Sequence, residues 1–281
     1  MKYEPILVVG NSGKTGARVE QRLKAQGWPT RGVSRSSNPA FDWNAPDTWS
    51  EALEDVQSAY VTFYPDLAIP ASEKMMNDFV EVAIGCGLKH MVLLSGRGEK
   101  GAERAEHTLQ NSGLTWNVVR ANWFMQNFSE AFMIEGVING ELMLPAGDIV
   151  EPFVDVDDIA DVAVAALTQP ELKNRLFEVS GPRALSFAQC AEEISEVTGY
   201  TVKYTQITID EFLGALKDQG QPDEVRWLMN ELFTVVFDGR NSVPTHGVME
   251  ALGRQPTDFK QYLEKVMDSG AWDRSGWLKQ A

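Results

Sequence analysis

A glycine-rich segment near the start of the chain has the residue types and spacing of a phosphate-binding turn. Gly10, Gly13 and Gly16 form the pattern G-x-x-G-x-x-G, directly after the apolar run 6–9 and before an amphipathic stretch over 15–26. A phosphate can approach such a turn closely because glycine lacks a Cβ atom, and the N–H groups of a helix's first turn favour negative charge. We therefore expect dinucleotide binding here. Beside the glycines, the expected contacts come from Asn11, Ser12, Lys14 and Thr15.

The stretch after the first predicted helix carries the residues that would select one nicotinamide dinucleotide over the other. An NAD site usually places a carboxylate about 20 residues beyond the glycines, where it binds a ribose hydroxyl. That place holds Ser34, Arg35 and Ser36. Arg35 can pair with a 2′-phosphate through two N–H groups, and no carboxylate stands there to repel the phosphate. We expect NADP(H) as the cofactor; the alternative is that Arg35 is an ordinary surface arginine.

Later predicted strands should bring further residues to the cofactor, because parallel strands present their carboxyl ends at one edge of a sheet. Residues 41–43 are interpreted as the end of a third strand, where Asp42 would hydrogen-bond the adenine and Trp43 would shield it. The remaining expected cofactor residues lie at the ends of the next two strands: Thr62, Phe63, Tyr64, Ser95 and Gly96.

These positions require a sheet whose strands alternate with helices. Apolar, partly β-branched runs alternate with helical patterns, the strands at 6–9, 30–37, 58–65, 90–95 and 115–120 and the helices at 15–26, 49–53, 71–86 and 102–111. The alternation predicts an α/β fold with a doubly wound parallel sheet, the Rossmann arrangement. We expect a dinucleotide-binding domain over residues 1–153. A smaller α/β substrate-binding part is expected over 154–281, with some strands and helices returning to the Rossmann sheet.

A proton donor is harder to find. Short-chain dehydrogenases usually carry Tyr-x-x-x-Lys on the helix that follows the strand ending near Ser95, with the Tyr as acid. None of the six tyrosines has a Lys four positions further on. The predicted helix 102–111 offers Glu106 and His107 instead, and these two residues with Ser95 are the catalytic candidates. The alternative is that the protein only orients the hydride, while water supplies the proton.

Composition and charge exclude several classes of function. The chain has 281 residues and a formal net charge of −15 at pH 7, which argues against a nucleic-acid partner because phosphate contacts need a basic surface. No apolar run is long enough to span a bilayer, and no basic-then-apolar leader is present, so we expect a cytoplasmic protein without a membrane partner. Cys86 and Cys190 are too few for a disulfide framework or a zinc cluster.

An acidic cluster at 155–158 raises a metal site as an alternative. Asp155, Asp157 and Asp158 directly precede or begin an apolar helical pattern over 159–167. Carboxylates near a helix N-terminus cap it and complement its dipole. We therefore expect these residues to stabilise the start of a helix, and we expect neither a metal nor a flavin.

Several motifs resemble those of one family. They are the glycine pattern, the Arg-ending second strand, Asp42-Trp43, Ser95-Gly96, and the runs 112–128 and 152–160. Together they are similar to the NmrA-like atypical short-chain dehydrogenases. Leu232-Phe233 and the segment 238–240 (Asp-Gly-Arg) resemble the festuclavine-dehydrogenase-like branch. The chain departs from the common R-P-x-W-F pattern, because Ala121 and Asn122 follow Arg120.

The resemblance implies one of two functions. The first is an NADPH-dependent oxidoreductase that transfers hydride to a conjugated, electron-poor acceptor, namely a quinone, azo compound, imine or enone. The second is an NADP(H)-binding redox sensor with little or no turnover. A flat aromatic substrate would suit a pocket walled by Tyr64, Ser95, Trp123, Phe124 and Phe153. The alternative, which is equally open for Phe153 and less favoured for Trp123, is that these aromatic residues fill the core. Both a monomer and a homodimer are compatible with the sequence.

Overall fold

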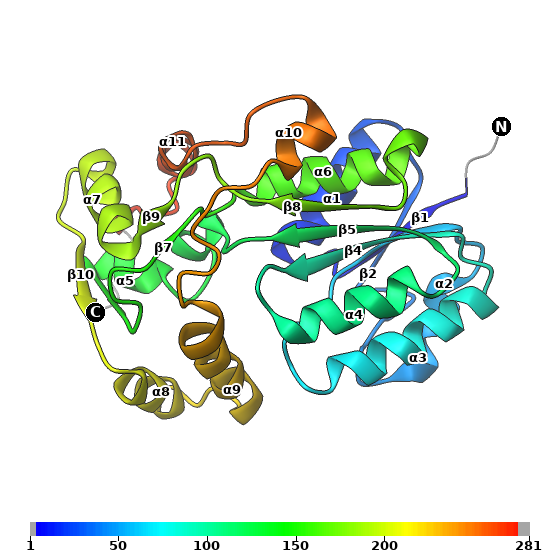
Figure 1. Ribbon diagram of the computed structural model, residues 1–281, viewed down its shortest axis with the longest axis horizontal. Helices are drawn as coiled ribbons and strands as arrows, with labels where there is room; N and C mark the ends of the chain where they lie inside the picture. The colour runs from blue at the N-terminus through cyan, green and yellow to red at the C-terminus, as the bar shows by residue number, and fades with distance from the viewer. Residues whose placement is uncertain (1–3, 275–281) are drawn as a thin grey trace. The chain divides into compact units, whose positions relative to one another are not determined.

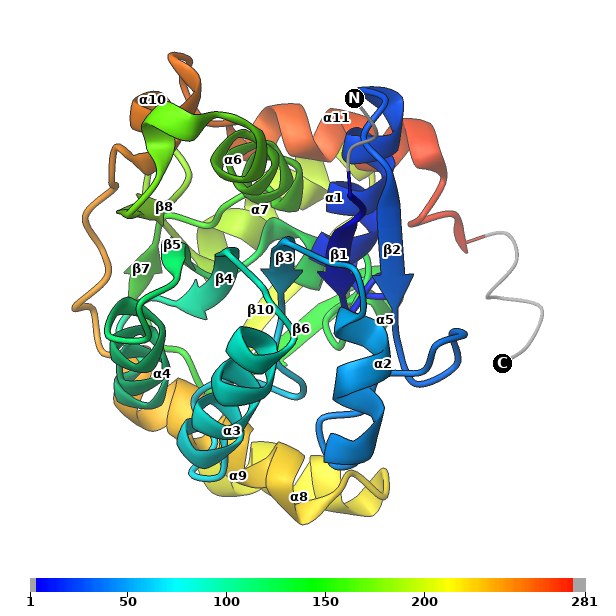
Figure 2. The same ribbon diagram turned by 90° about the vertical axis from the view of Figure 1, so that its right-hand side faces the viewer.

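Six parallel strands form the main sheet of the computed structural model, which describes residues 4–274. The last residues of the expected C-terminal part, 275–281, lie outside the described residues. The strand order is β2-β1-β3-β4-β5-β8, visible edge-on in Figure 2. The strands are β1 Ile6–Val9, β2 Thr30–Val33, β3 Ser58–Val61, β4 His90–Gly96, β5 Thr115–Ala121 and β8 Arg175–Val179.

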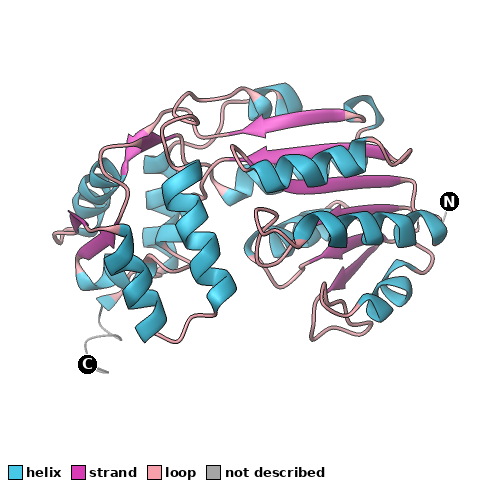
Figure 3. Cartoon of the chain, turned by 60° about the horizontal axis from the view of Figure 1, so that its bottom comes forward, coloured by secondary structure: helices cyan, strands magenta, loops and turns pink. Residues whose placement is uncertain are grey.

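Helices cover both faces of this sheet, as the apolar strands require. All four residues of β1 are buried, and a parallel sheet that is buried on both faces needs a helical layer on each side. α1 and α6 lie on one face, and α2, α3 and α4 on the other (Figures 1 and 3). These helices are α1 Lys14–Ala25, α2 Trp49–Leu53, α3 Ser72–Gly85, α4 Lys100–Gln110 and α6 Val156–Thr168. The predicted doubly wound α/β sheet is confirmed.

The expected third strand at 41–43 is not formed. Phe41 and Trp43 turn their rings into the core, where they pack against Trp49 and Phe79. The backbone between them bonds to its own turn, since the Ala45 N–H and the Trp49 indole N–H both donate to the Asp42 carbonyl. The segment was wrongly predicted as a strand because buried aromatic residues also fill irregular turns.

The chain divides into two units, each built from several segments. The first unit contains residues 4–121, 156–179 and 246–254, and the second contains 122–155, 180–245 and 255–274 of the described chain. The expected boundary after residue 153 therefore falls inside a segment of the second unit. The chain returns to the first unit with α6 and β8, and again with α10 Gly247–Leu252.

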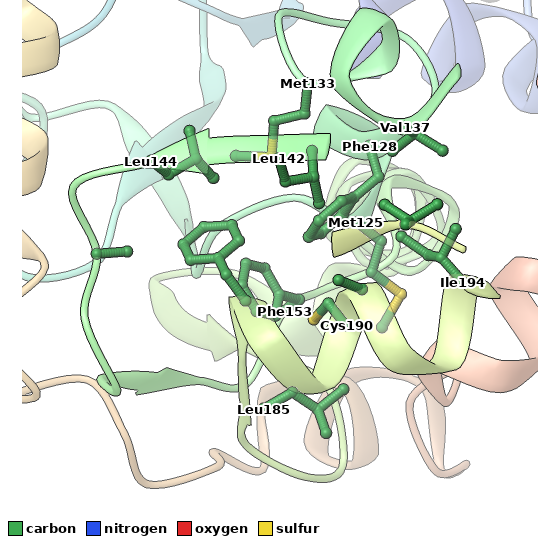
Figure 4. Close-up of a cluster of buried hydrophobic side chains, with 14 of the residues drawn as sticks. Met125, Phe128, Met133, Val137, Leu142, Leu144, Phe153, Leu185, Cys190 and Ile194 are labelled. Carbon is green, nitrogen blue, oxygen red and sulfur yellow. The ribbon is translucent and has the colours of Figure 1, made fainter. Parts of the chain in front are cut away.

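The second unit combines short strands with helices around an apolar core of its own. β6 pairs in parallel with β10, and β7 pairs antiparallel with β9. Figure 4 shows side chains of this core, among them Phe128, Phe153 and Cys190. The strands and helices are β6 Glu141–Leu144, β7 Val150–Glu151, β9 Leu185–Ser186, β10 Lys203–Gln206, α5 Ile134–Asn139, α7 Phe187–Thr198, α8 Ile209–Asp218, α9 Asp223–Glu231 and α11 Phe259–Ser269, with a π-helical turn at Leu232–Val236.

The acidic start of α6 is occupied by ion pairs. Arg22 on α1 binds Asp157 at 2.7 Å, and Arg254 binds Asp158 at 2.7 Å. Asp157 and Asp158 also lie in the first turn of α6, where the helix dipole favours carboxylates. Among residues 4–274, no group of three or more His, Cys, Asp or Glu side chains could hold a metal ion. Within the same residues, no helix has the length and apolar character needed to cross a membrane.

Candidate functional site

The glycine turn joins the carboxyl end of β1 to α1 through a very close backbone approach. A Cβ atom on Gly16 would lie 2.2 Å from the Gly10 carbonyl oxygen, and one on Gly13 would lie 3.3 Å from that oxygen. Gly10 has φ +79°, a region that favours glycine. Its N–H donates to the Val33 carbonyl of β2, and the Gly13 N–H donates back to the Gly10 carbonyl. The turn therefore brings backbone without Cβ atoms at Gly10, Gly13 and Gly16 to the carboxyl edge of the sheet.

The N-terminus of α1 is suited to an anion. Its N-cap, Gly13, supplies no side-chain hydrogen bond, and the first turn contains no acidic residue. By contrast, Ser186, Thr208 and Asp258 form capping boxes at the starts of α7, α8 and α11. The positive end of the α1 dipole and a turn without Cβ atoms thus meet at one place. The backbone N–H groups at such a helix start can hold the pyrophosphate of a dinucleotide.

Arg35 and its neighbouring serines lie on a closed loop directly after β2. The Ser37 hydroxyl accepts the Ser34 N–H at 2.7 Å and contacts the Pro39 carbonyl at 2.6 Å. The Ser34 carbonyl accepts the Phe41 N–H at 2.9 Å. These bonds close the loop on itself while Arg35 and Ser36 stay exposed to solvent. The structure therefore presents a guanidinium and hydroxyl groups beside the glycine turn, because β2 is the neighbour of β1.

The residues expected around the adenine have different environments. Trp43 is only 6% exposed and its indole N–H donates to the Thr62 carbonyl, so it belongs to the core rather than to a surface that an adenine could reach. The Asp42 carboxylate accepts the N–H of Asn44. Thr62 donates to the Val9 carbonyl at 3.0 Å, which ties the end of β3 to the end of β1. Tyr64, by contrast, is 63% exposed.

Ser95 and Glu106 belong to one buried polar network. The Ser95 hydroxyl donates to Glu106 Oε1 at 2.5 Å, and Arg120 donates to both carboxylate oxygens of Glu106, with Nε at 2.9 Å from Oε1. Arg120 also donates to Glu178 at 2.8 Å. The hydrogen bonds that Arg120 donates to Glu106 are the main reason that the pKa of Arg120 is raised, despite its partial burial. Glu106, which is 1% exposed, is therefore enclosed by donors on both carboxyl oxygens.

This network changes the catalytic assignment. Both carboxyl oxygens of Glu106 accept hydrogen bonds from Ser95 or Arg120 inside the protein, so the group is not placed to donate a proton to a substrate. The single hydroxyl proton of Ser95 is directed to Glu106, which leaves the Ser95 oxygen as an acceptor. His107 is exposed and lies in the last turn of α4, away from the Glu106 side chain that packs inward. The structure does not bring His107 together with Ser95 and Glu106.

Arg120 and Glu178 were missed as site residues, although the sequence contains a signal for them. Ser95 pairs in register with Arg120, and Arg120 with Glu178, at the carboxyl ends of β4, β5 and β8. In-register residues of parallel neighbours share one face of the sheet. A polar residue near the end of each of three apolar strands was therefore the signal, but it becomes informative only once the strand order is known.

A second missed feature is a pair of carboxyl groups, Asp66 and Glu99. Asp66 follows β3 and Glu99 is the N-cap of α4. A Cβ on Gly101 would lie 2.7 Å from the Leu67 carbonyl oxygen, which shows how closely the two segments approach. Burial raises the pKa of Asp66, while hydrogen bonds from Glu99 and from the Ala68 N–H lower it by less. Two carboxyl groups can hydrogen-bond only if one of them keeps a proton.

The predicted substrate residues of the second unit divide into core and partly exposed positions. Phe153 is 2% exposed, and its ring lies 5.6 Å from that of Phe128 and 5.3 Å from that of Phe187. It is a core residue, which corrects its assignment to a pocket wall. Trp123 and Phe124 are half-buried, and the Trp123 ring lies 5.1 Å from that of Phe233.

Comparisons with known proteins converge on one family. The sequence profile of the NmrA-like family matches residues 103–263. The NAD(P)H azoreductase of Xenophilus azovorans is 30% identical over 283 residues, covering 92% of this chain and 96% of the relative. The agroclavine dehydrogenase of Claviceps fusiformis is also 30% identical over 281 residues, covering 92% of this chain and 96% of the relative.

A solved structure shares the fold. The NADPH-dependent quinone oxidoreductase of Escherichia coli, in complex with NADPH, superposes with a TM-score of 0.78 at 17% identity. The match covers 93% of this chain and 99% of that protein. At this identity the likeness establishes the fold of the chain.

We expect Glu106→Gln to destabilise the protein by about 3 kcal/mol, because the amide cannot compensate the half-buried Arg120 charge. Urea unfolding monitored by circular dichroism measures the loss. The matched control is Glu73→Gln on α3, which removes the exposed ion pair with Arg104 and should cost less than about 1 kcal/mol. Equal losses in the two variants would contradict the buried network.

The raised pKa of Asp66 gives a pH-dependent prediction. The folded state holds this proton more tightly than the unfolded state, so stability should fall as pH rises from the usual aspartate pKa to the raised one. Asp66→Asn removes the titration but keeps an acceptor for the Ala68 N–H and a donor for Glu99. The wild-type urea midpoint should therefore fall relative to that of Asp66→Asn as pH rises through this window.

The control for that series is Asp47→Asn, at an exposed position in the same unit. Its urea midpoint should run parallel to the wild-type midpoint from about pH 4 upward. If the urea midpoints of wild type and Asp66→Asn instead changed in parallel with pH, Asp66 would titrate normally. That result would contradict the carboxyl pair.

Proposed function

Because the chain belongs to the NmrA-like family, we propose that it is an NADPH-dependent reductase that transfers hydride to a flat, conjugated, electron-poor acceptor. The observation that carries the proposal is the turn at Gly10, Gly13 and Gly16, where backbone without Cβ atoms meets the N-terminus of α1. The acceptor class is a quinone, azo compound, imine or enone. The azoreductase and the agroclavine dehydrogenase among the relatives support this range.

The residues of the first unit fit NADP(H). In this proposal the N–H groups at the start of α1 hold the pyrophosphate, with Asn11, Ser12, Lys14 and Thr15 around it. Arg35, Ser34 and Ser36 hold the 2′-phosphate. Thr62, Phe63 and Tyr64 follow β3, and Ser95 and Gly96 end β4, on the two strands next in order after β1. When bound, the cofactor supplies the hydride.

The protein's own contribution is mainly orientation and electrostatics. Glu106 and Arg120 fix the Ser95 hydroxyl so that its oxygen can accept a hydrogen bond at the end of β4. Reduction of the acceptor requires a proton besides the hydride. Because Glu106 is enclosed in the buried network and His107 faces solvent, we assign that proton to water.

Trp123 and Phe124 are proposed as ring surfaces for the acceptor. Both residues are half-buried rather than buried, and a flat conjugated molecule gains from stacking on aromatic faces. Phe153 is left out because it is fully packed in the core. The substrate of this enzyme is thus expected to be small and aromatic or conjugated.

The test is NADPH consumption by the purified protein, followed by absorbance, with a panel of quinones, azo dyes, cyclic imines and conjugated enones. We expect turnover with at least one class, and a kcat/KM at least about tenfold higher with NADPH than with NADH, because charge-assisted bonds to the 2′-phosphate are lost in NADH. Tight NADPH binding without turnover on any acceptor would contradict the reductase. It would favour an NADP(H)-binding redox sensor, in line with the missing Tyr-x-x-x-Lys pair.

A further inference from the structure

Arg35 differs from the other arginines of the first unit. Seven of those arginines pair with carboxylates: Arg18, Arg22, Arg97, Arg104, Arg120, Arg175 and Arg254. Arg31 donates to the carbonyls of Ala52 and Glu54. Arg35 does neither within the described chain. In a protein with a net charge of −15, a guanidinium that forms no ion pair within residues 4–274 is available for an external anion.

The guanidinium of Arg35 lies over an aromatic ring instead. Its central carbon is 5.1 Å from the centroid of the Tyr64 ring, within the range of a cation–π interaction. Tyr64 itself is 63% exposed, so core packing does not account for its ring. The contact therefore joins two exposed side chains from the loops that follow β2 and β3.

The topology explains how these loops meet. β1 has β2 on one side and β3 on the other, and all three strands are parallel. Their carboxyl ends therefore share one edge, with the glycine turn in the middle. The loop after β2 is closed by the hydrogen bonds of Ser37, and Thr62 fixes the end of β3 to Val9. The backbone segments that carry Arg35 and Tyr64 are thus both fixed by hydrogen bonds.

We propose that Tyr64 is a positioning residue for Arg35, and that it holds the guanidinium ready for the 2′-phosphate of the dinucleotide. The five N–H groups of a guanidinium lie in its plane. Within the described residues the Arg35 side chain has the Tyr64 ring as its contact and forms no hydrogen bond, so its N–H groups stay available to phosphate oxygens. A free arginine side chain loses considerable rotamer entropy on binding, and an aromatic support reduces that loss. Tyr64 would then contribute to the choice of NADPH over NADH. This inference rests on the proposed function.

The test uses two nucleotide fragments, adenosine 2′,5′-bisphosphate and adenosine 5′-monophosphate, and measures their affinities by isothermal titration calorimetry. Removing the ring with Tyr64→Leu should weaken bisphosphate binding about two- to fivefold, the size of an exposed cation–π interaction. Any loss of monophosphate affinity should be clearly smaller, because that fragment lacks the 2′-phosphate that Arg35 would bind. Tyr64→Phe keeps the ring and should bind the bisphosphate with wild-type affinity. If the hydroxyl group were responsible, Tyr64→Phe would lose as much affinity as Tyr64→Leu.

Two control variants separate the inference from the proposed function. Phe132→Leu removes another exposed ring, which is 41% exposed and lies in the second unit, and should change neither affinity. Arg35→Ala should abolish the preference for the bisphosphate. If wild type binds both fragments equally, or Arg35→Ala has no effect, the 2′-phosphate assignment in the proposed function fails.

Two outcomes would overturn the inference alone. Arg35→Ala could lose bisphosphate affinity while Tyr64→Leu keeps it, and Tyr64 would then be irrelevant to Arg35. Alternatively, Tyr64→Leu could weaken both fragments equally. That result would mean that the ring contacts the adenine or ribose rather than supporting the guanidinium.

Discussion

The start of α1 approaches the end of β1 so closely that no side chain fits between them, and the rest of the candidate site depends on this contact. A Cβ on Gly16 would lie 2.2 Å from the Gly10 carbonyl oxygen, so the helix can reach this position only with glycine there. Thr62 then ties β3 to the carbonyl of Val9, and the Gly10 N–H ties the turn to β2. Three strand ends are in this way fixed around one helix terminus that is suited to an anion.

Charge pairing determines which side chains remain available at that edge. The chain is strongly acidic, and most arginines of the first unit are neutralised by carboxylates that come from distant parts of the sequence. Inside the protein, Arg120 binds both oxygens of Glu106, and Glu106 in turn accepts the Ser95 proton. Arg35 forms no ion pair of this kind within the described residues. The carboxyl pair at Asp66 and Glu99 shows the opposite case, in which burial raises the pKa of Asp66 and favours a retained proton.

Much of the fold could be predicted from the sequence because its signals are local. Buried runs such as Ile6–Val9 and His90–Gly96, and the glycine spacing between 10 and 16, indicate strands and a helix start without any tertiary information. The segment 41–43 failed because its aromatic residues are equally at home in a packed turn. The division into units could not be found locally either, since α6, β8 and α10 join the first unit from far along the chain.

The candidate site shows the same limit. The glycine turn and the loop with Arg35 are contiguous in sequence and were identified, whereas the partners of Ser95 and Glu106 depend on strand register. Phe153 and Trp43 could not be recognised as core residues, because an aromatic side chain has the same sequence signature in a pocket wall and in a core. Arg35 and Tyr64 were each assigned to ligands, but their mutual contact follows only from the order β2-β1-β3.

The most direct measurement is a crystal structure of the protein with NADP⁺. We expect the pyrophosphate at the N-terminus of α1, against Gly13, and the 2′-phosphate within hydrogen-bond distance of Arg35. A dinucleotide bound away from the glycine turn would contradict the central claim. A 2′-phosphate pointing into solvent without contacting Arg35 would contradict the assignment of the cofactor.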